Sequence, residues 1–122
     1  MASTTTVNNN EGVVRVASGL ITASATATDV YIQLGFVPKY FMLHGLVNLL
    51  RQEWFEGMNQ GDFIESAAAG DRTLETDDQL VVGAVGDVRD ATADQPGEGE
   101  VLVQAGGGIL DDNDGAVWYA IG

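Results

Sequence analysis

Residues 34–58, LGFVPKYFMLHGLVNLLRQEWFEGM, decide the fold of this chain. Pro38 has no backbone N–H to donate to a sheet, so it belongs at the mouth of a strand. Apolar side chains then alternate on both sides of residues 40–46, which is typical of a central or doubly covered strand. Residues 47–51 predict a turn, and residues 52–56 predict a second strand that returns from it.

Outward from this stretch, the chain is a series of short strand patterns separated by turn-forming residues. Residues 63–67 are ambiguous between a strand and a helical turn, and Ser18-Gly19 predicts a turn. The sixteen glycines and the lack of a long helical pattern favour an all-β fold, an antiparallel β-sandwich or jelly roll. No crossover helices are available for a parallel sheet. We expect the remaining strands at 13–17, 21–27, 30–34, 71–75, 79–82, 100–104 and 116–121.

A chain of 122 residues fits one domain. Residues 1–11 are mostly small and polar and predict a flexible N-terminal arm, and residues 12–122 predict the β-sandwich domain. Gly83 to Gly99 is rich in glycine and acids, so we expect a solvent-facing loop that folding does not require. Without cysteine the chain can build neither disulfides nor thiolate metal sites.

The formal net charge of −13, with only five basic residues, argues against nucleic acids and anionic membranes as partners. No apolar run is long enough for a transmembrane helix, and no secretory signal is present, so we expect synthesis in a cytoplasm. Twelve acids lie between Asp71 and Gly122. They are explained either as ordinary solvated turns or as a surface that keeps neighbouring particles apart.

No residue pattern in this sequence predicts catalysis, a metal or a cofactor. His44 is the sole histidine, which favours a packed or interface imidazole over a zinc ligand. Asp111 to Gly115 is oxygen-rich but lacks EF-hand spacing and favours a hairpin turn, and Gly106 to Gly108 is followed by no lysine. Glu53 and Glu56 could suggest a glycosidase pair, but an aromatic strand edge explains this motif better. We therefore expect no enzymatic activity.

Two adjacent aromatic pairs predict an interaction surface. In a strand, neighbouring side chains point to opposite faces, so one member of each pair should face inward and the other outward. Outward aromatic side chains on a small acidic protein indicate an interface, where such residues are enriched. An arm with no folded role of its own would add to it by ordering on a partner. The candidate interface residues are Val7, Asn8, Asn9, Asn10, Trp54, Phe55, Trp118 and Tyr119.

The central stretch resembles a group of small virion proteins of tailed bacteriophages with a "GF-x-P-x-Y…(N)…EWFEGM…GTRTL" layout. The last six residues, VWYAIG, also look like the closing strand of these proteins and of H-type lectin sandwiches. The resemblance covers residues 34–74 and the last six residues, and it includes no catalytic motif. The matching residues are Gly35, Phe36, Pro38, Tyr40, Asn48, Glu53, Trp54, Phe55, Glu56, Gly57, Met58, Gly70, Arg72, Thr73 and Leu74.

The resemblance implies a head-decoration, or cement, protein on the outside of the virion capsid. Its partners would be the major capsid protein and other copies of itself, in a homo-oligomer that we expect to be a trimer. The alternative is a carbohydrate- or receptor-binding module of a tail or head fibre, which the lectin-like ending suggests. A fibre module usually continues from a repetitive or coiled-coil stalk, and this sequence has no such segment.

Overall fold

The structure, a computed structural model, describes residues 15–22, 29–104, 109 and 114–122. Within this part of the chain every element is a strand except one short 3₁₀ helix, η1, and the predicted all-β antiparallel fold is confirmed. The strands are β1 Val16–Thr22, β2 Val30–Gln33, β3 Tyr40–Gly45, β4 Arg51–Phe55, β5 Phe63–Ser66, β6 Arg72–Glu75, β7 Leu80–Val82, β8 Glu100–Val103 and β9 Gly115–Ile121, and η1 is Ala91–Ala93.

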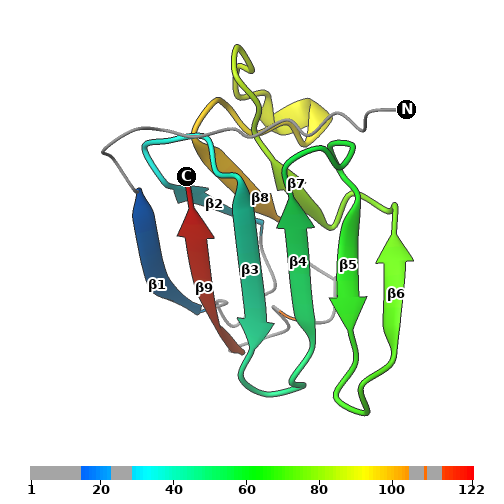
Figure 1. The fold of residues 1–122 in the computed structure, drawn as a ribbon. Helices are drawn as coiled ribbons and strands as arrows, with labels where there is room; N and C mark the ends of the chain where they lie inside the picture. Colours follow the sequence, from blue (N-terminus) through cyan, green and yellow to red (C-terminus); the bar gives the residue numbers. More distant parts are fainter. Residues whose placement is uncertain (1–14, 23–28, 105–108, 110–113) are drawn as a thin grey trace, which may run out of the picture.

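The strands form two antiparallel sheets that face each other. Six strands lie side by side in the order β1-β9-β3-β4-β5-β6, and three form a smaller sheet in the order β2-β8-β7, which crosses behind the first in Figure 1. Consecutive hairpins connect β3 to β6, whereas β9 inserts between β1 and β3. The two ends of the described chain therefore pair with each other, and β9 also borders the central strand β3.

The strand pair predicted from residues 34–58 is the centre of the larger sheet. Pro38 is buried two residues before β3 begins, and β3 pairs with β4 and β9, as expected of a central strand. The side chains of β3 alternate between half-buried and fully buried positions. One face of this sheet therefore supplies the core, and the other face remains partly exposed.

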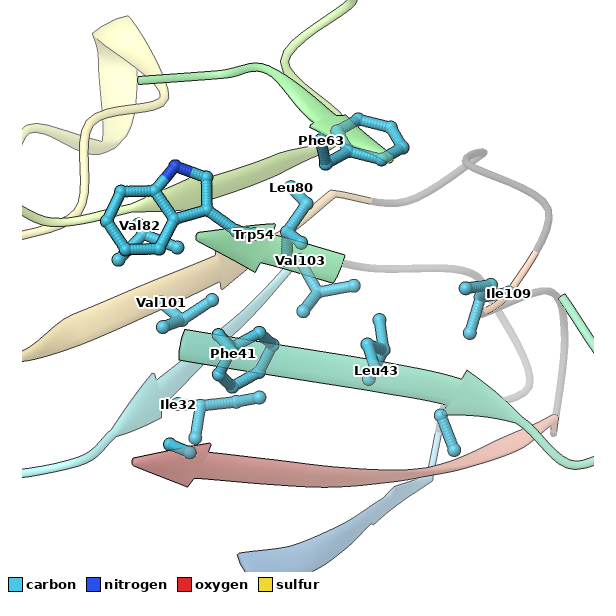
Figure 2. Packing of buried hydrophobic residues seen from close by; sticks show 12 residues of the cluster. Ile32, Phe41, Leu43, Trp54, Phe63, Leu80, Val82, Val101, Val103 and Ile109 are labelled. Atoms are coloured by element: carbon cyan, nitrogen blue, oxygen red, sulfur yellow. The ribbon is translucent and has the colours of Figure 1, made fainter. Parts of the chain in front are cut away.

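The hydrophobic core lies between the two sheets. Phe41, Trp54 and Phe63 from the six-stranded sheet point toward Leu80 and Val101 of the three-stranded sheet (Figure 2). Phe41 has no exposed surface, and Trp54 is about one-tenth exposed. Burial of these large side chains is the main favourable contribution to folding. The structure thus explains why the apolar alternation in β3 and β4 was the strongest signal in the sequence.

Two local expectations are corrected by the strands themselves. Ser18-Gly19 is not a turn, because β1 runs straight through it and pairs with β9 along its whole length. Within the ambiguous residues 63–67, Phe63–Ser66 form the strand β5 rather than a helical turn, and the chain turns only after Ala67. In both places tertiary pairing decides the conformation that local propensity left open.

The segment 83–99 is only partly the dispensable surface loop expected from its composition. Residues 84–86 and 88–94 are exposed, but Pro96 and Gly97 are buried. Arg89 lies over the ring of Tyr31, 4.4 Å from its centroid, and forms an ion pair with the buried carboxylate of Glu100. Arg89 and Gly97 therefore contact the smaller sheet, and these parts of the segment belong to the folded body.

Candidate interaction face

The face of the six-stranded sheet that points away from the core is the candidate functional site. Strand pairing fixes which side chains share it, because side chains alternate along each strand. We call these residues the outer face. They form three rows across the sheet, namely Val16-Ile121-Tyr40-Phe55, Ser18-Tyr119-Met42-Glu53-Ile64-Leu74 and Leu20-Val117-His44-Arg51-Ser66-Arg72.

The outer face is unusually apolar for an exposed surface. Leu20 is 63% exposed and Leu74 is 60% exposed, although they lie on strands at opposite edges of the sheet. Among the described residues ten large apolar side chains are exposed, and eight of them lie on this face or in the loop that joins β3 to β4. They are Val16, Leu20, Leu46, Val47, Leu49, Phe55, Leu74 and Val117. A concentration of exposed apolar side chains on one sheet face and its adjoining loop is typical of a binding site rather than of a solvated sheet.

The structure places one member of each predicted aromatic pair on the outer face. Phe55 is 40% exposed there and packs against Tyr40, with ring centroids 5.0 Å apart. Tyr119 lies in the middle row and is half-buried. Trp54 and Trp118 point inward instead and belong to the core or pack against it. The predicted alternation is therefore correct, and the two tryptophans are removed from the list of interface residues.

Trp118 is held on the core side by two contacts. Its ring stacks on Phe41 with centroids 6.1 Å apart, and it covers Gly19 on the neighbouring strand β1. Trp118 therefore joins the inner surfaces of three strands, β1, β9 and β3. Its role is to stabilise the sheet that carries the outer face.

A small polar network lies at the centre of the otherwise apolar face. Glu53 is almost fully buried and accepts a hydrogen bond of 2.7 Å from the Tyr40 hydroxyl. Its other oxygen, Oε1, lies 3.3 Å from Arg51 Nε and 3.2 Å from an Arg72 nitrogen. Burial, together with the Glu53 carboxylate, raises the pKa of Tyr40 to about 12. One carboxylate is thus shared by two arginines, and the network keeps one unit of positive charge.

Two hollows flank Arg72 on this face. One has a volume of about 410 Å³ and is lined by His44, Leu49, Arg51, Ser66, Ala67, Ala68, Gly70 and Arg72. The other, about 480 Å³, is lined by Phe55, Ile64, Arg72, Thr73 and Leu74. Two arginines and a histidine line the first, which we call the basic hollow, whereas Arg72 is the one charged residue among the described residues that line the second, which we call the apolar hollow. Both lie at the end of the sheet formed by β4, β5 and β6.

Sequence reasoning identified the aromatic part of this face but not its other half. Arg51 and Arg72 are far apart in the chain, and only the β4–β5–β6 pairing brings them to either side of Ser66. His44, predicted to be packed or at an interface, is half-buried beside Arg51. Leu20 and Leu74 carry no local signal of exposure, and only the strand register places them on this face.

The described residues that the sequence raised as metal or catalytic candidates have other places in the structure. In the described residues, no three His, Cys, Asp or Glu side chains are close enough together to hold a metal ion. Glu53 is engaged by Arg51 and Arg72, and Glu56 follows β4 in a turn. Val7 to Asn10, Gly106 to Gly108 and Asp111 to Asn113 lie outside the described residues.

Comparisons of the chain with protein-family models, curated proteins and solved structures gave no match. In the described part of the chain no helix is long and apolar enough to cross a membrane. The structural part of the functional argument therefore rests on the outer face.

Proposed function

We propose that this chain is a decoration, or cement, protein of a tailed bacteriophage, and that it docks on the outside of the capsid through the outer face. The observation that carries the proposal is the concentration of exposed apolar side chains on one sheet face of a protein with a net charge of −13. Such a face is unfavourable in water and becomes favourable when a partner covers it.

The size of the outer face suits a protein partner. Five spacings of about 4.8 Å between six strands give a width of roughly 24 Å. Strands of four to seven residues, at about 3.3 Å per residue, give the face a projected area of roughly a few hundred Å², which approaches the area of about 800 Å² that each partner buries in a standard interface. Phe55, Tyr119 and Met42 on this face are of the types that are enriched at protein interfaces.

The charge distribution supports a role on a particle surface. The three charged side chains within the rows of the outer face are Arg51, Arg72 and Glu53, while most acids of the chain lie in turns and loops elsewhere. Once the outer face is covered, the protein presents a strongly acidic surface to the surroundings. Like charge on neighbouring particles opposes their aggregation.

A cement protein acts by linking subunits that would otherwise separate. Each docked copy stabilises the assembled shell by mass action, and copies that contact one another or several capsid subunits bind more strongly through multivalency. We propose a trimer on the capsid, because shells offer threefold and quasi-threefold junctions where three subunits meet. The N-terminal segment, with Val7 to Asn10, would add contacts with the major capsid protein.

The test is binding of the purified chain to empty, expanded capsids of the phage that encodes it, measured by co-sedimentation, beside binding to a host-glycan array. Saturable capsid binding with no glycan binding is the expected result. Binding to glycans alone would instead support the alternative, a receptor-binding module. Negative-stain images of virions labelled for this protein would locate it on the head or on the tail.

A further inference from the structure

We propose that the basic hollow on the outer face is a carboxylate-binding subsite, which receives an aspartate or glutamate side chain from an extended segment of the partner protein. The inference rests on the proposed function for the identity of the partner, but the chemistry of the subsite follows from Arg51, Ser66 and Arg72 alone. These three residues are neighbours in one cross-strand row and line the same hollow.

The first argument is charge. Arg51 and Arg72 both approach the same oxygen of Glu53, and within the described residues neither guanidinium has another acidic partner. The side chain of Arg51 is 43% exposed and that of Arg72 is 57% exposed, so both can accept a further ligand. Arginine presents several N–H donors in a planar fork that matches a carboxylate. One unit of excess positive charge suits a monovalent carboxylate better than a phosphate dianion, which Glu53 would repel.

The second argument is a buried hydroxyl without a partner. Ser66 is 8% exposed, lines the basic hollow, and its Oγ makes no hydrogen bond in the described structure. A buried polar group left without a partner costs free energy, so such groups are usually satisfied in the working state of a protein. The Ser66 hydroxyl is covered in the free protein, so we propose that the flanking arginine side chains turn aside as a carboxylate enters and accepts a third hydrogen bond from it.

The third argument is the apolar hollow on the other side of Arg72. Ile64 precedes Ser66 by two residues on β5, and Leu74 follows Arg72 by two residues on β6. Residues two apart on a strand are about 7 Å from each other. An extended partner segment with an acidic side chain and a large apolar side chain two residues away would therefore fill both hollows. The acidic side chain in one hollow and the apolar side chain in the other would fix the orientation of the partner segment on the sheet, because electrostatic complementarity contributes specificity.

The chemistry is tested on the free protein with two short peptides. The probe is acetyl-Glu-Thr-Leu-amide, its control is acetyl-Gln-Thr-Leu-amide, and binding is followed by NMR of the labelled chain. We expect millimolar binding of the Glu peptide that perturbs the Arg51, Ser66 and Arg72 signals, and at least about fivefold weaker binding of the Gln peptide. Equal binding of the two peptides would overturn the proposal, as would inorganic phosphate binding more tightly than acetate.

Three variants separate binding from folding. Ser66→Ala removes a hydroxyl that has no partner, so it should leave the melting temperature unchanged or slightly higher and still weaken the Glu peptide several-fold. Arg72→Gln should weaken it by about tenfold, and Arg72→Lys should have an intermediate effect because it keeps the charge but loses the fork. Arg15→Gln, an exposed residue outside the three rows, removes the same charge and should change little. Unchanged affinity in both Ser66→Ala and Arg72→Gln would overturn the proposal.

The same variants distinguish a failure of the subsite from a failure of the proposed function. If the wild-type chain binds capsids and Arg72→Gln binds them equally well, the subsite is wrong and the docking face stands. If the wild-type chain binds no capsids, the decoration role is wrong, and the peptide titration alone decides whether the subsite exists. Loss of capsid binding in Arg72→Gln but not in Arg15→Gln would support both.

Discussion

Gly19 lies directly opposite Trp118 in the β1–β9 ladder, and the indole ring covers it so closely that a Cβ at residue 19 would lie 2.8 Å from two ring atoms. The ring cannot move freely, because it also stacks on Phe41. We expect Gly19→Ala to lower the free energy of unfolding by about 1–3 kcal/mol, the usual cost of overpacking. Urea unfolding measures this.

Ser18→Ala is the matched control for this prediction, since Ser18 is the neighbouring residue on the exposed side of the same strand. It should change the free energy of unfolding by less than about 0.5 kcal/mol. If Gly19→Ala were as stable as Ser18→Ala, Trp118 would not be fixed against β1 as described.

The same pair of residues explains where sequence reasoning succeeded and where it did not. A Ser-Gly dipeptide is a common turn signal, and only the presence of Trp118 on the adjoining strand shows why glycine is needed inside β1. By contrast, Pro38 and the alternation that follows it are local signals, and they located β3 and β4 correctly. Local pattern predicts strands, whereas pairing partners depend on the whole chain.

The candidate site, too, could be predicted only in part from the sequence. Alternation predicted that each aromatic pair would be split between core and surface, but not which member would face the solvent. Arg51, Ser66 and Arg72 form one row only because the turns after β4 and β5 set the register of the three strands. No local feature of the sequence encodes that register, so the basic hollow could not be predicted before the structure.

Tyr40 should make stability depend on pH in the alkaline range. Its pKa is raised from 10.0 to about 12, so between these values the unfolded chain loses the phenol proton while the folded chain retains it. The free energy of unfolding should therefore fall as pH rises from 10 to 12. Tyr40→Phe should flatten this fall and cost about 1 kcal/mol at neutral pH through loss of the hydrogen bond to Glu53. Tyr119→Phe, also on the outer face, is the control, and identical alkaline profiles for the two variants would contradict the assignment.

Glu100 should make stability depend on pH in the acid range. Its carboxylate accepts hydrogen bonds from Arg89 Nε at 3.0 Å and from the Gly97 N–H at 2.8 Å. The bond from Arg89 is the main reason that the pKa of Glu100 lies below its ordinary value of 4.5. The stabilisation is complete above pH 4.5 and is lost as pH falls through the folded-state pKa. Glu100→Gln should reduce the acid dependence of the melting temperature, whereas Asp77→Asn, in an exposed turn, should retain it.

The segment 83–99 should tolerate change only at residues that are exposed and make no contact with the smaller sheet. Replacing Ala91–Ala93 with glycine and serine should leave the melting temperature nearly unchanged, since all three residues are exposed. Replacing Val88 to Glu98 should lower it by several degrees, because this removes buried Pro96 and the Arg89 side chain that pairs with Glu100. Equal melting temperatures for the two replacements, measured by circular dichroism, would restore the view of this segment as a dispensable loop.

The outer face should be required for docking but not for folding. Leu20 and Leu74 are exposed at opposite edges of the six-stranded sheet, so Leu20→Ser combined with Leu74→Ser should change the free energy of unfolding by less than about 1 kcal/mol. If these side chains contact the capsid, the same double variant should lose most of its binding. Burial of each leucine side chain would contribute about 1.5–3 kcal/mol to the binding free energy, and serine would contribute almost none of it. Co-sedimentation with empty capsids at increasing protein concentration measures the loss.

Val85→Ser combined with Val88→Ser is the matched control for the outer face, because these two side chains are even more exposed, at 77% and 78%, but lie in the acidic segment 83–99. Their removal lowers exposed apolar surface by a similar amount without touching the sheet. Docking through the outer face therefore requires that the Leu20/Leu74 variant binds weakly while the Val85/Val88 variant binds like the wild type. The opposite result would move the capsid contact to the acidic segment, and the apolar sheet face would then need a different partner.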